Sequence, residues 1–221
     1  VTCTSAPITF TVTINPTPTV TLGANPSVCV GTTAANLGYS ATTGTPNQYS
    51  IDFNAAAQAQ GFVDVVNAAL PATPIVITVP GAAAPGTYTG TLTVRNSTTG
   101  CISATQAVSV TILPSPTITL GANPSVCVGA TSANLAYSAT TASPNQYSIN
   151  FNGAAEAQGF VDVANAALPA SPLVITVPAA AAAGIYNATL TVTNSVTGCI
   201  STTQNISVTV VANPTITLGA N

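Results

Sequence analysis

The chain has 221 residues, which is enough for one large domain or two domains of ordinary size. Only 2% of these residues are charged, namely four acidic residues and one arginine, and the formal net charge is −3. This composition excludes nucleic-acid binding, which requires clustered lysine and arginine, and no apolar run approaches the roughly 18–20 residues of a membrane-spanning helix.

An internal repeat organises the chain. The ten residues LGANPSVCVG at 22–31 recur unchanged at 120–129, and LGAN returns at 218–221. Residues 18–115 align with residues 116–213 without a gap, at an offset of 98, and about three quarters of the positions are identical. This period is too long for one turn of a solenoid, and it matches the size of a self-contained β-sandwich domain.

We therefore predict a tandem array of domains, called beads below. Bead 1 comprises residues 16–113 and bead 2 comprises residues 114–212. Residues 1–15 are interpreted as the last strand of a preceding repeat, and residues 213–221 as the first strand of a following repeat. The unfinished third copy of the repeated phrase leads us to expect that the chain is a segment of a longer protein.

Within bead 1, apolar residues alternate with polar or small residues in several short stretches. The alternating sets are Val20 and Leu22; Leu37, Tyr39 and Ala41; Tyr49, Ile51 and Phe53; Ile75, Ile77 and Val79; Tyr88, Leu92 and Val94; and Val108, Val110 and Ile112. A period of two predicts antiparallel strands with an apolar inner face and a hydroxyl-rich outer face. Turn-forming segments separate these strands, for example TGTPNQ at 43–48 and NSTTG at 96–100. The pattern predicts an all-β, immunoglobulin-like antiparallel sandwich in each bead.

One segment of each bead does not follow the strand pattern. In AAAQAQGFVDVVNAAL, residues 55–70, the apolar residues Phe62, Val65 or Val66, and Leu70 lie at roughly helical spacing. We expect a helical turn here, with an irregular loop as the alternative.

The five cysteines follow the repeat, because each bead has two and Cys3 belongs to the preceding unit. Disulfides are typical of oxidising, extracellular compartments. One pairing joins Cys29 to Cys101 and Cys127 to Cys199, within beads, and leaves Cys3 unpaired. The alternative joins Cys3 to Cys29 and Cys101 to Cys127, between units. We favour the within-bead pairs because an early strand can run parallel beside the last strand of the same bead, and such a link would contribute roughly 4 kcal/mol.

Residues suited to catalysis are scarce. Without histidine or lysine, the remaining candidate bases are Asp52, Asp64, Glu156 and Asp162, of which only Asp64 and Asp162 correspond between beads. One shared carboxylate per bead cannot form an acid–base pair or a calcium site with several carboxylates. We therefore predict no enzyme activity, no cofactor and no metal, and we expect Asp64 to hydrogen-bond a local turn.

Sequon asparagines and tyrosines are the remaining candidate site residues. Asn-x-Ser/Thr sequons occur at a frequency near chance for this composition, at Asn96, Asn187 and Asn205. The tyrosines alternate with strand residues and are predicted to be core or sheet-edge residues rather than a ligand platform; they are Tyr39, Tyr49, Tyr88, Tyr137, Tyr147 and Tyr186. The near-absence of charge leads us to expect side-by-side association of copies, because strand edges are usually protected by charged residues.

Four stretches resemble a PKD-like/Ig-like repeat. They are VCVGTTAANLGYSATTGTPNQYSIDFN, GFVDVVNAALPATPIVITVP, APGTYTGTLTVRNSTTGC and VSVTILPSPTITL. Such repeats are found in giant cell-surface proteins of Bacteroidetes, including SprB-type gliding-motility adhesins. The resemblance implies export to the bacterial cell surface, a long tandem array, and a role as an adhesin or surface filament whose partners are neighbouring repeats, other copies and surface polysaccharide.

The sequence is compatible with three hypotheses of function. The leading one is a structural segment of an extracellular filament or stalk-like adhesin. The second is a carbohydrate-binding sandwich module, which the shortage of aromatic residues in the loops disfavours. The third is a fibre subunit that polymerises by strand donation, in which the alternating Ile8, Phe10, Val12 and Ile14 complete the sheet of a neighbour.

Overall fold

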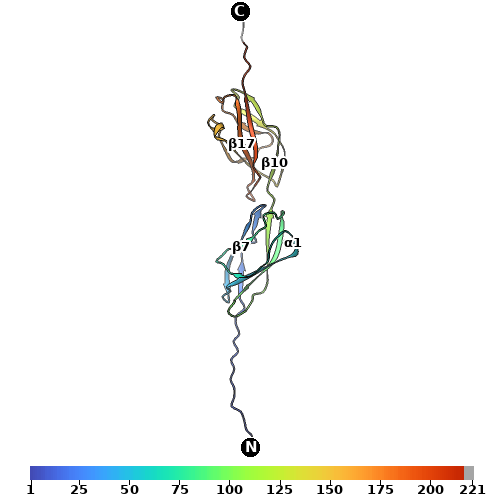
Figure 1. The fold of residues 1–221 in the computed structure, drawn as a ribbon, viewed down its shortest axis with the longest axis vertical. Coiled ribbons are helices and arrows are strands. Elements are labelled where there is room, and N and C mark those ends of the chain that lie inside the picture. Colours follow the sequence, from blue (N-terminus) through green and yellow to red (C-terminus); the bar gives the residue numbers. More distant parts are fainter. Residues whose placement is uncertain (217–221) are drawn as a thin grey trace, which may run out of the picture. The chain divides into compact units, whose positions relative to one another are not determined.

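The computed structural model describes residues 1–216, and the chain divides into two compact units, Val1–Ile112 and Leu113–Asn221. Each unit contains one bead built almost entirely of strands (Figure 1). The predicted first strand of a following repeat, 213–221, extends beyond the described residues.

Bead 1 has nine strands and one short helix. They are β1 (Thr19–Leu22), β2 (Ser27–Cys29), β3 (Ala34–Leu37), β4 (Tyr39–Thr43), β5 (Gln48–Phe53), α1 (Ala55–Ala59), β6 (Val65–Ala69), β7 (Ile75–Thr78), β8 (Gly86–Arg95) and β9 (Gln106–Leu113). The larger sheet has the strand order β2-β9-β8-β5-β6, and the opposite layer consists of the antiparallel pairs β1–β4 and β3–β7. Two layers of mostly antiparallel strands enclose the core, as predicted from the alternation.

Bead 2 repeats this arrangement. Its elements are β10 (Thr117–Leu120), β11 (Ser125–Cys127), β12 (Ser132–Leu135), β13 (Tyr137–Thr141), β14 (Gln146–Phe151), α2 (Gly153–Glu156), β15 (Val163–Ala167), β16 (Leu173–Thr176), β17 (Gly184–Asn194), β18 (Cys199–Ile200) and β19 (Gln204–Val211). The larger sheet runs β11-β19-β17-β14-β15, with the two-residue strand β18 paired to β17. The opposite layer again consists of two antiparallel pairs, β10–β13 and β12–β16.

The core of each bead is formed by the inward residues of both layers. In bead 1, Leu37 and Ile75 from one layer and Leu92 and Val94 from the other have no exposed surface. Burying a leucine or valine side chain contributes about 1.5–3 kcal/mol, so these facing rows stabilise the sandwich. The described residues contain no buried polar or charged side chain.

A tyrosine near the start of the long strand marks the topology of each bead. The Tyr88 hydroxyl donates to the carbonyl oxygen of Ala84 at 2.8 Å, and Tyr186 makes the same bond to Ala182 at 2.6 Å. A buried tyrosine bonded to backbone a few residues upstream is the tyrosine corner of immunoglobulin-like domains. The parallel pairing of β11 with β19 beside antiparallel neighbours completes this arrangement. Each bead is therefore an immunoglobulin-like β-sandwich.

Residues 55–70, which do not follow the strand pattern in the sequence, form a short helix and then a strand. Residues 55–59 form the expected helical turn α1, whose N-cap Asn54 accepts a hydrogen bond from the Ala57 amide at 2.9 Å. Residues 65–69 form strand β6 instead of continuing the helix, because their backbone pairs with β5. Phe62 lies between the two and is buried against Phe53, with ring centroids 5.0 Å apart.

Residues 1–18 form neither helix nor strand, and Ile8, Phe10, Val12 and Ile14 are exposed. At the 98-residue offset, this segment matches strand β9. The three residues there that correspond to Phe10, Val12 and Ile14 are buried, namely Val108, Val110 and Ile112.

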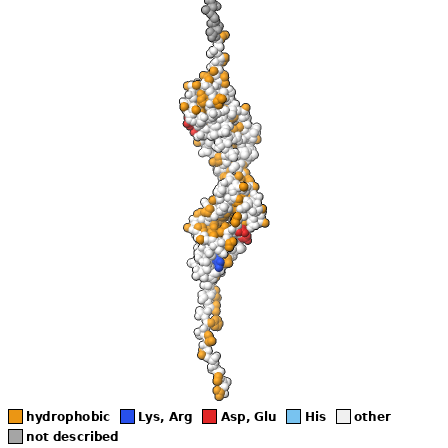
Figure 2. All heavy atoms as spheres, in the orientation of Figure 1, with side chains coloured by type: hydrophobic (Ala, Val, Ile, Leu, Met, Phe, Trp, Pro, Cys, Tyr) orange, Lys and Arg blue, Asp and Glu red, His pale blue; other side chains and the backbone are white. Residues whose placement is uncertain are grey.

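The surface carries almost no charge. Figure 2 shows small red and blue areas on a face that is otherwise uncharged, with apolar atoms scattered over both units. This distribution follows from the sequence, which places threonine and serine on the outward positions of the strands.

Candidate functional site

The two cysteines of bead 2 lie at opposite ends of the sandwich. Cys127 is the last residue of β11 and pairs with Val211, at the end of the last strand. Cys199 pairs with Asn194, the last residue of β17. Because Gly184 at the start of β17 pairs with Val210, the 11 residues of β17 separate the two cysteines. At a rise of 3.3 Å per residue this is on the order of 30 Å, whereas disulfide-bonded Cα atoms lie about 4.4–6.8 Å apart.

In bead 1, strand β2 lies beside β9 in the same register as β11 beside β19 in bead 2. The Thr111 amide donates to the Pro26 carbonyl at 3.0 Å, as Thr209 does to Pro124 in bead 2. Strand β2 is the neighbour of β9, and the bond from Thr111 places Cys29 near the end of that strand. The Cys101 carbonyl accepts from the Asn96 amide at 3.0 Å, just beyond the end of β8.

The within-bead pairs Cys29–Cys101 and Cys127–Cys199 therefore do not fit the register of either bead. Cys29 does lie beside the last strand, as expected, but at the end of that strand rather than at its start. The reason is that β2 is only three residues long and pairs with the final residues of β9. Cys3, Cys101 and Cys127 have free thiols, whereas Cys29 and Cys199 are each in the disulfide state.

Asp64 stabilises the segment that follows α1. Its Oδ1 accepts hydrogen bonds from the Phe53 amide at 2.8 Å and from the Gln58 side chain at 3.2 Å. In bead 2, Asp162 accepts from the Phe151 amide at 2.7 Å and from the Asn150 side chain at 3.0 Å. The carboxylate is a structural hydrogen-bond acceptor, as predicted, but its partners lie on the preceding strand and, in bead 1, in helix α1 rather than in its own turn. Within residues 1–216 there is no group of three or more His, Cys, Asp or Glu side chains that could hold a metal ion.

The tyrosines are structural, as predicted. Tyr88 and Tyr186 are buried, and each ring packs on a phenylalanine, with centroids 5.1 Å apart in bead 1. Tyr39 and Tyr137 lie half-buried on β4 and β13, and their hydroxyls donate to the carbonyls of Pro71 and Pro169.

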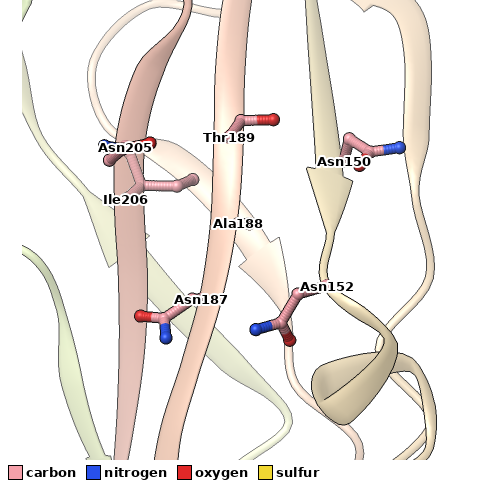
Figure 3. A pocket seen from close by; sticks show the side chains of 7 residues that line it. All are labelled: Asn150, Asn152, Asn187, Ala188, Thr189, Asn205 and Ile206. Atoms are coloured by element: carbon pink, nitrogen blue, oxygen red, sulfur yellow. The ribbon is translucent and has the colours of Figure 1, made fainter.

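An asparagine-rich face lies on the larger sheet of bead 2 around a depression of about 400 Å³. Its polar side chains are Asn150, Asn152, Asn187, Thr189 and Asn205. Figure 3 shows Asn187 and Thr189 on the strand of Ala188, β17, with Asn205 on β19 to one side and Asn150 on β14 to the other; Asn152 follows β14 as the N-cap of α2. Strand register places Thr189 opposite Asn205 and Asn187 opposite Ser207. Asn187 and Asn205 are thus two sequon asparagines whose sequons face each other across β17 and β19.

The asparagine-rich face is specific to bead 2. Bead 1 has Asp52, Thr89 and Ala107 where bead 2 has Asn150, Asn187 and Asn205, and its depression is about 240 Å³. In the sequence, two of these asparagines, Asn187 and Asn205, are recognisable only as sequons. Outward asparagines at alternate positions 150 and 152, beside 187 and 205 on neighbouring strands, would have been a usable signal.

Asn96, the third sequon asparagine, is hydrogen-bonded within a turn. The Asn96 side chain donates to the Gly44 carbonyl at 3.1 Å and to Thr45 Oγ1 at 2.9 Å, and its oxygen accepts from the Thr98 and Thr99 amides. These bonds fix Asn96 in the loop structure.

Each bead also has an apolar groove where the two layers leave strand edges open. In bead 1 the groove measures about 270 Å³ and is lined by residues of β5, β6 and β7. Val63 and Val76 at its rim expose 76% and 55% of their surface. Bead 2 has the equivalent groove of about 260 Å³, with Val161 and Val174 at the rim.

Comparisons with known proteins return immunoglobulin-domain structures at low similarity. A pair of titin domains in complex with telethonin shares 13% identity, with 91% of this chain and 100% of that chain covered and a TM-score of 0.33. Eight N-terminal Ig domains of Down Syndrome Cell Adhesion Molecule share 13% identity, covering 90% of this chain and 25% of that one, with a TM-score of 0.41. The insect immune protein hemolin shares 14% identity over 89% of this chain and 47% of that one, with a TM-score of 0.31.

No protein-family model matches the chain, and no curated protein matches it. Among the residues that the structure describes, no helix is long and apolar enough to cross a membrane.

Proposed function

We propose that the chain is a structural segment of an extracellular bacterial surface filament or stalk-like adhesin. Its working unit is the immunoglobulin-like bead, and residues 1–15 supply the last strand of a preceding bead. The resemblance to PKD-like repeats of Bacteroidetes surface proteins, including SprB-type gliding adhesins, supports this role, and the disulfide-bonded cysteines suit an oxidising, extracellular location.

The observation that carries the proposal is the path of the chain through one bead. In bead 2, the chain enters at Thr117, which pairs with Thr141. The adjoining Ala142 carbonyl accepts from Asn194, the last residue of β17. The chain leaves at Val211, beside the start of β17. Because it enters at one end of the sandwich and leaves at the other, identical beads can be strung in series without crossing the chain over itself.

Lateral association of copies is the second part of the proposal. The strands β6 and β7 are sheet edges, and valines at the rim of the groove between them are exposed. Sheet edges of this kind are usually protected by lysine or other charges. The whole chain has one arginine and no lysine, so protection by positive charge is almost absent.

The native protein from its source cells tests the proposal directly. Antibodies raised against the 221-residue chain should label the surface of intact cells, and the detected protein should have a mass many times 21.6 kDa. A native protein of about 21.6 kDa that assembles into fibres would instead support strand donation. Labelling only after cell lysis would overturn the surface role.

The asparagine-rich face of bead 2 favours a second candidate function, binding of an uncharged carbohydrate. Amide groups can both donate to and accept from hydroxyl groups, and the exposed side chains of Asn187 and Asn205 flank the depression. The double variant Asn187→Thr with Asn205→Ala converts these positions to those of bead 1. On a glycan array, we expect the unmodified chain to bind neutral polysaccharide and the double variant to lose that binding; equal signals from both would exclude this site.

A further inference from the structure

We propose that Asn152 in bead 2 is a site of spontaneous covalent modification, where the asparagine converts to aspartate or isoaspartate through a ring formed with the backbone of Gly153. The side chains that line the depression around Asn152 are all uncharged, so the conversion places a negative charge on the asparagine-rich face. The inference concerns bead 2 alone and holds whether or not this face binds carbohydrate.

The first observation is the residue that follows Asn152. Asn152 and Gly153 form the only Asn-Gly pair in the chain. The backbone nitrogen of the residue after an asparagine can attack the carbonyl carbon of the asparagine side chain, and glycine permits the closest approach because it has no Cβ. At the equivalent place in bead 1, Asn54 is followed by Ala55. The two beads therefore provide a natural comparison between a favourable and an unfavourable pair.

The second observation is that both reacting nitrogens are unengaged. In the described part of the chain, neither the Gly153 amide nor Asn152 Nδ2 takes part in a hydrogen bond. The Asn152 side chain is exposed, and only its Oδ1 is bonded, accepting from the Ala155 amide at 2.9 Å. Its amide nitrogen faces the strand that carries Asn187 (Figure 3). No hydrogen bond has to be broken at the attacking nitrogen or at the leaving group.

In bead 1, by contrast, the leaving group is held. Asn54 Nδ2 donates to Thr89 Oγ1 at 2.6 Å. Bead 2 has Asn187 at the position of this threonine. The substitution in bead 2 therefore coincides with the loss of the bond that retains the side-chain amide in bead 1.

The two Asn-Ser pairs of the chain, at 96–97 and 194–195, are held more firmly still. At 194–195, the asparagine side chain donates to the Ala142 carbonyl at 3.0 Å and the serine amide donates to Asn145 Oδ1 at 2.9 Å. Both groups are likewise hydrogen-bonded at 96–97. Serine is the next smallest following residue in these pairs, yet the structure restrains both nitrogens that would react.

The backbone around Asn152 can open locally. Ring closure requires its ψ angle to rotate away from 160°, which disturbs the start of α2. This helix has only four residues, and short surface segments open with a much lower free energy than the whole domain. A Cβ added to Gly153 would meet no atom within 4 Å, so there is space around this residue.

The reaction consumes water and releases ammonia, with no change of oxidation state. The Gly153 nitrogen gives up its proton and forms a bond to Cγ of Asn152, and the bond from Cγ to Nδ2 breaks as ammonia leaves with that proton. Water then opens the five-membered imide. Attack at Cγ gives aspartate with the original backbone, whereas attack at the backbone carbonyl carbon gives isoaspartate, with the main chain passing through the side chain.

Ageing of the folded 221-residue chain tests the proposal. The chain is incubated at neutral pH and physiological temperature, and peptide mapping by mass spectrometry follows the conversion of each asparagine in the same sample. We expect conversion at Asn152 to exceed that at Asn54 and at both Asn-Ser pairs by about an order of magnitude, because only Asn152 precedes a residue without a side chain. A synthetic peptide of residues 148–158 serves as the unfolded reference. Equal rates at Asn152 and Asn54, or no conversion in the folded chain while the peptide converts fully, would overturn the proposal.

Two variants complete the test. Gly153→Ala restores the residue of bead 1 and should reduce conversion at Asn152 to the rate of Asn54, while circular dichroism verifies that the β structure is retained. Asn152→Asp should co-elute on anion exchange with the acidic species that forms in the aged, unmodified chain. An isoaspartate methyltransferase should label the aged chain and leave the aged Gly153→Ala variant unlabelled. Persistent conversion at Asn152 in a folded Gly153→Ala variant would contradict the role of the glycine.

Discussion

Asp64 shows what a carboxylate does in a chain that has almost none. Its Oδ1 accepts from the Phe53 amide at the end of β5, and it also accepts from Gln58 in α1. These bonds connect the helical turn to the sheet. The carboxylate is retained in bead 2 as Asp162, with the same backbone partner at Phe151.

Removing this carboxylate should destabilise bead 1. We expect Asp64→Ala to lower the free energy of unfolding by about 1–2 kcal/mol, because the Phe53 amide loses its acceptor. Urea unfolding followed by circular dichroism measures the change. Asp52→Asn is the matched control, since bead 2 has Asn150 at that position, and it should change stability by less than about 0.5 kcal/mol. Equal effects of the two variants would show that Asp64 has no special role.

The tyrosine corner leads to a second prediction about a single residue, Tyr88. Tyr88→Phe removes the bond to the Ala84 carbonyl and keeps the ring that packs against Phe62. The expected loss is about 0.5–1.5 kcal/mol, the usual net contribution of one hydrogen bond. Tyr49→Phe provides the comparison, because Tyr49 is half-buried at the sheet and takes no part in the corner. Thermal unfolding that ranks Tyr49→Phe as the more damaging variant would contradict this assignment.

At the scale of elements, the strands with an alternating pattern were predictable, and the three-residue strand β2 was not. Strands β5, β7, β8 and β9 carry period-two patterns long enough to recognise, and each lies where the pattern placed it. Strand β2 has only three residues, so its pairing depends on contacts with β9 that alternation cannot reveal. The disulfide pairing inferred from the sequence depended on that register, and it therefore placed Cys29 at the wrong end of the bead.

Open sheet edges are the other element-level feature. Strand β6 departs from regular pairing where Asn67 adopts a positive φ of 48° and its amide donates to Ser50 Oγ. The register with β5 shifts at this point. Such bulges make an edge a poor template for further pairing. Strand β7 has regular pairing with β3, and its outward residue Val76 is exposed.

Because β7 is a regular edge strand and β6 is not, we expect copies of the chain to associate through β7 and its counterpart β16. We expect the double variant Val76→Lys with Val174→Lys to reduce self-association, because lysine on an edge strand disfavours pairing with another edge. Sedimentation velocity over a concentration series measures this. Thr78→Ser with Thr176→Ser conserves the same strands without added charge and should associate like the unmodified chain. Unchanged association of the lysine variant would exclude β7 and β16 as the contact.

At the scale of the whole molecule, the scarcity of charge is the dominant property. With one arginine and four acidic residues, few electrostatic interactions exist for salt to screen. The chain also has no histidine, the side chain that most often titrates near neutrality.

Stability should therefore respond weakly to ionic strength. We expect the free energy of unfolding to change by less than about 0.5 kcal/mol between low salt and several hundred millimolar sodium chloride. Guanidinium is itself a salt, so urea is the appropriate denaturant. Self-association measured by light scattering should likewise be insensitive to sodium chloride. A several-fold fall in association at high salt would show that charge pairs hold the copies together.

The path of the chain through a bead also determines how the bead responds to tension. A pull on the two ends of bead 2 acts at Thr117 and at Val211, and the parallel ladder of β11 and β19 lies between these points. Hydrogen bonds in this ladder run across the direction of pull, so they must break together rather than one after another. A force along the chain is therefore shared among all bonds of the ladder, and we expect the bead to resist stretching more than a sheet whose bonds would break one at a time.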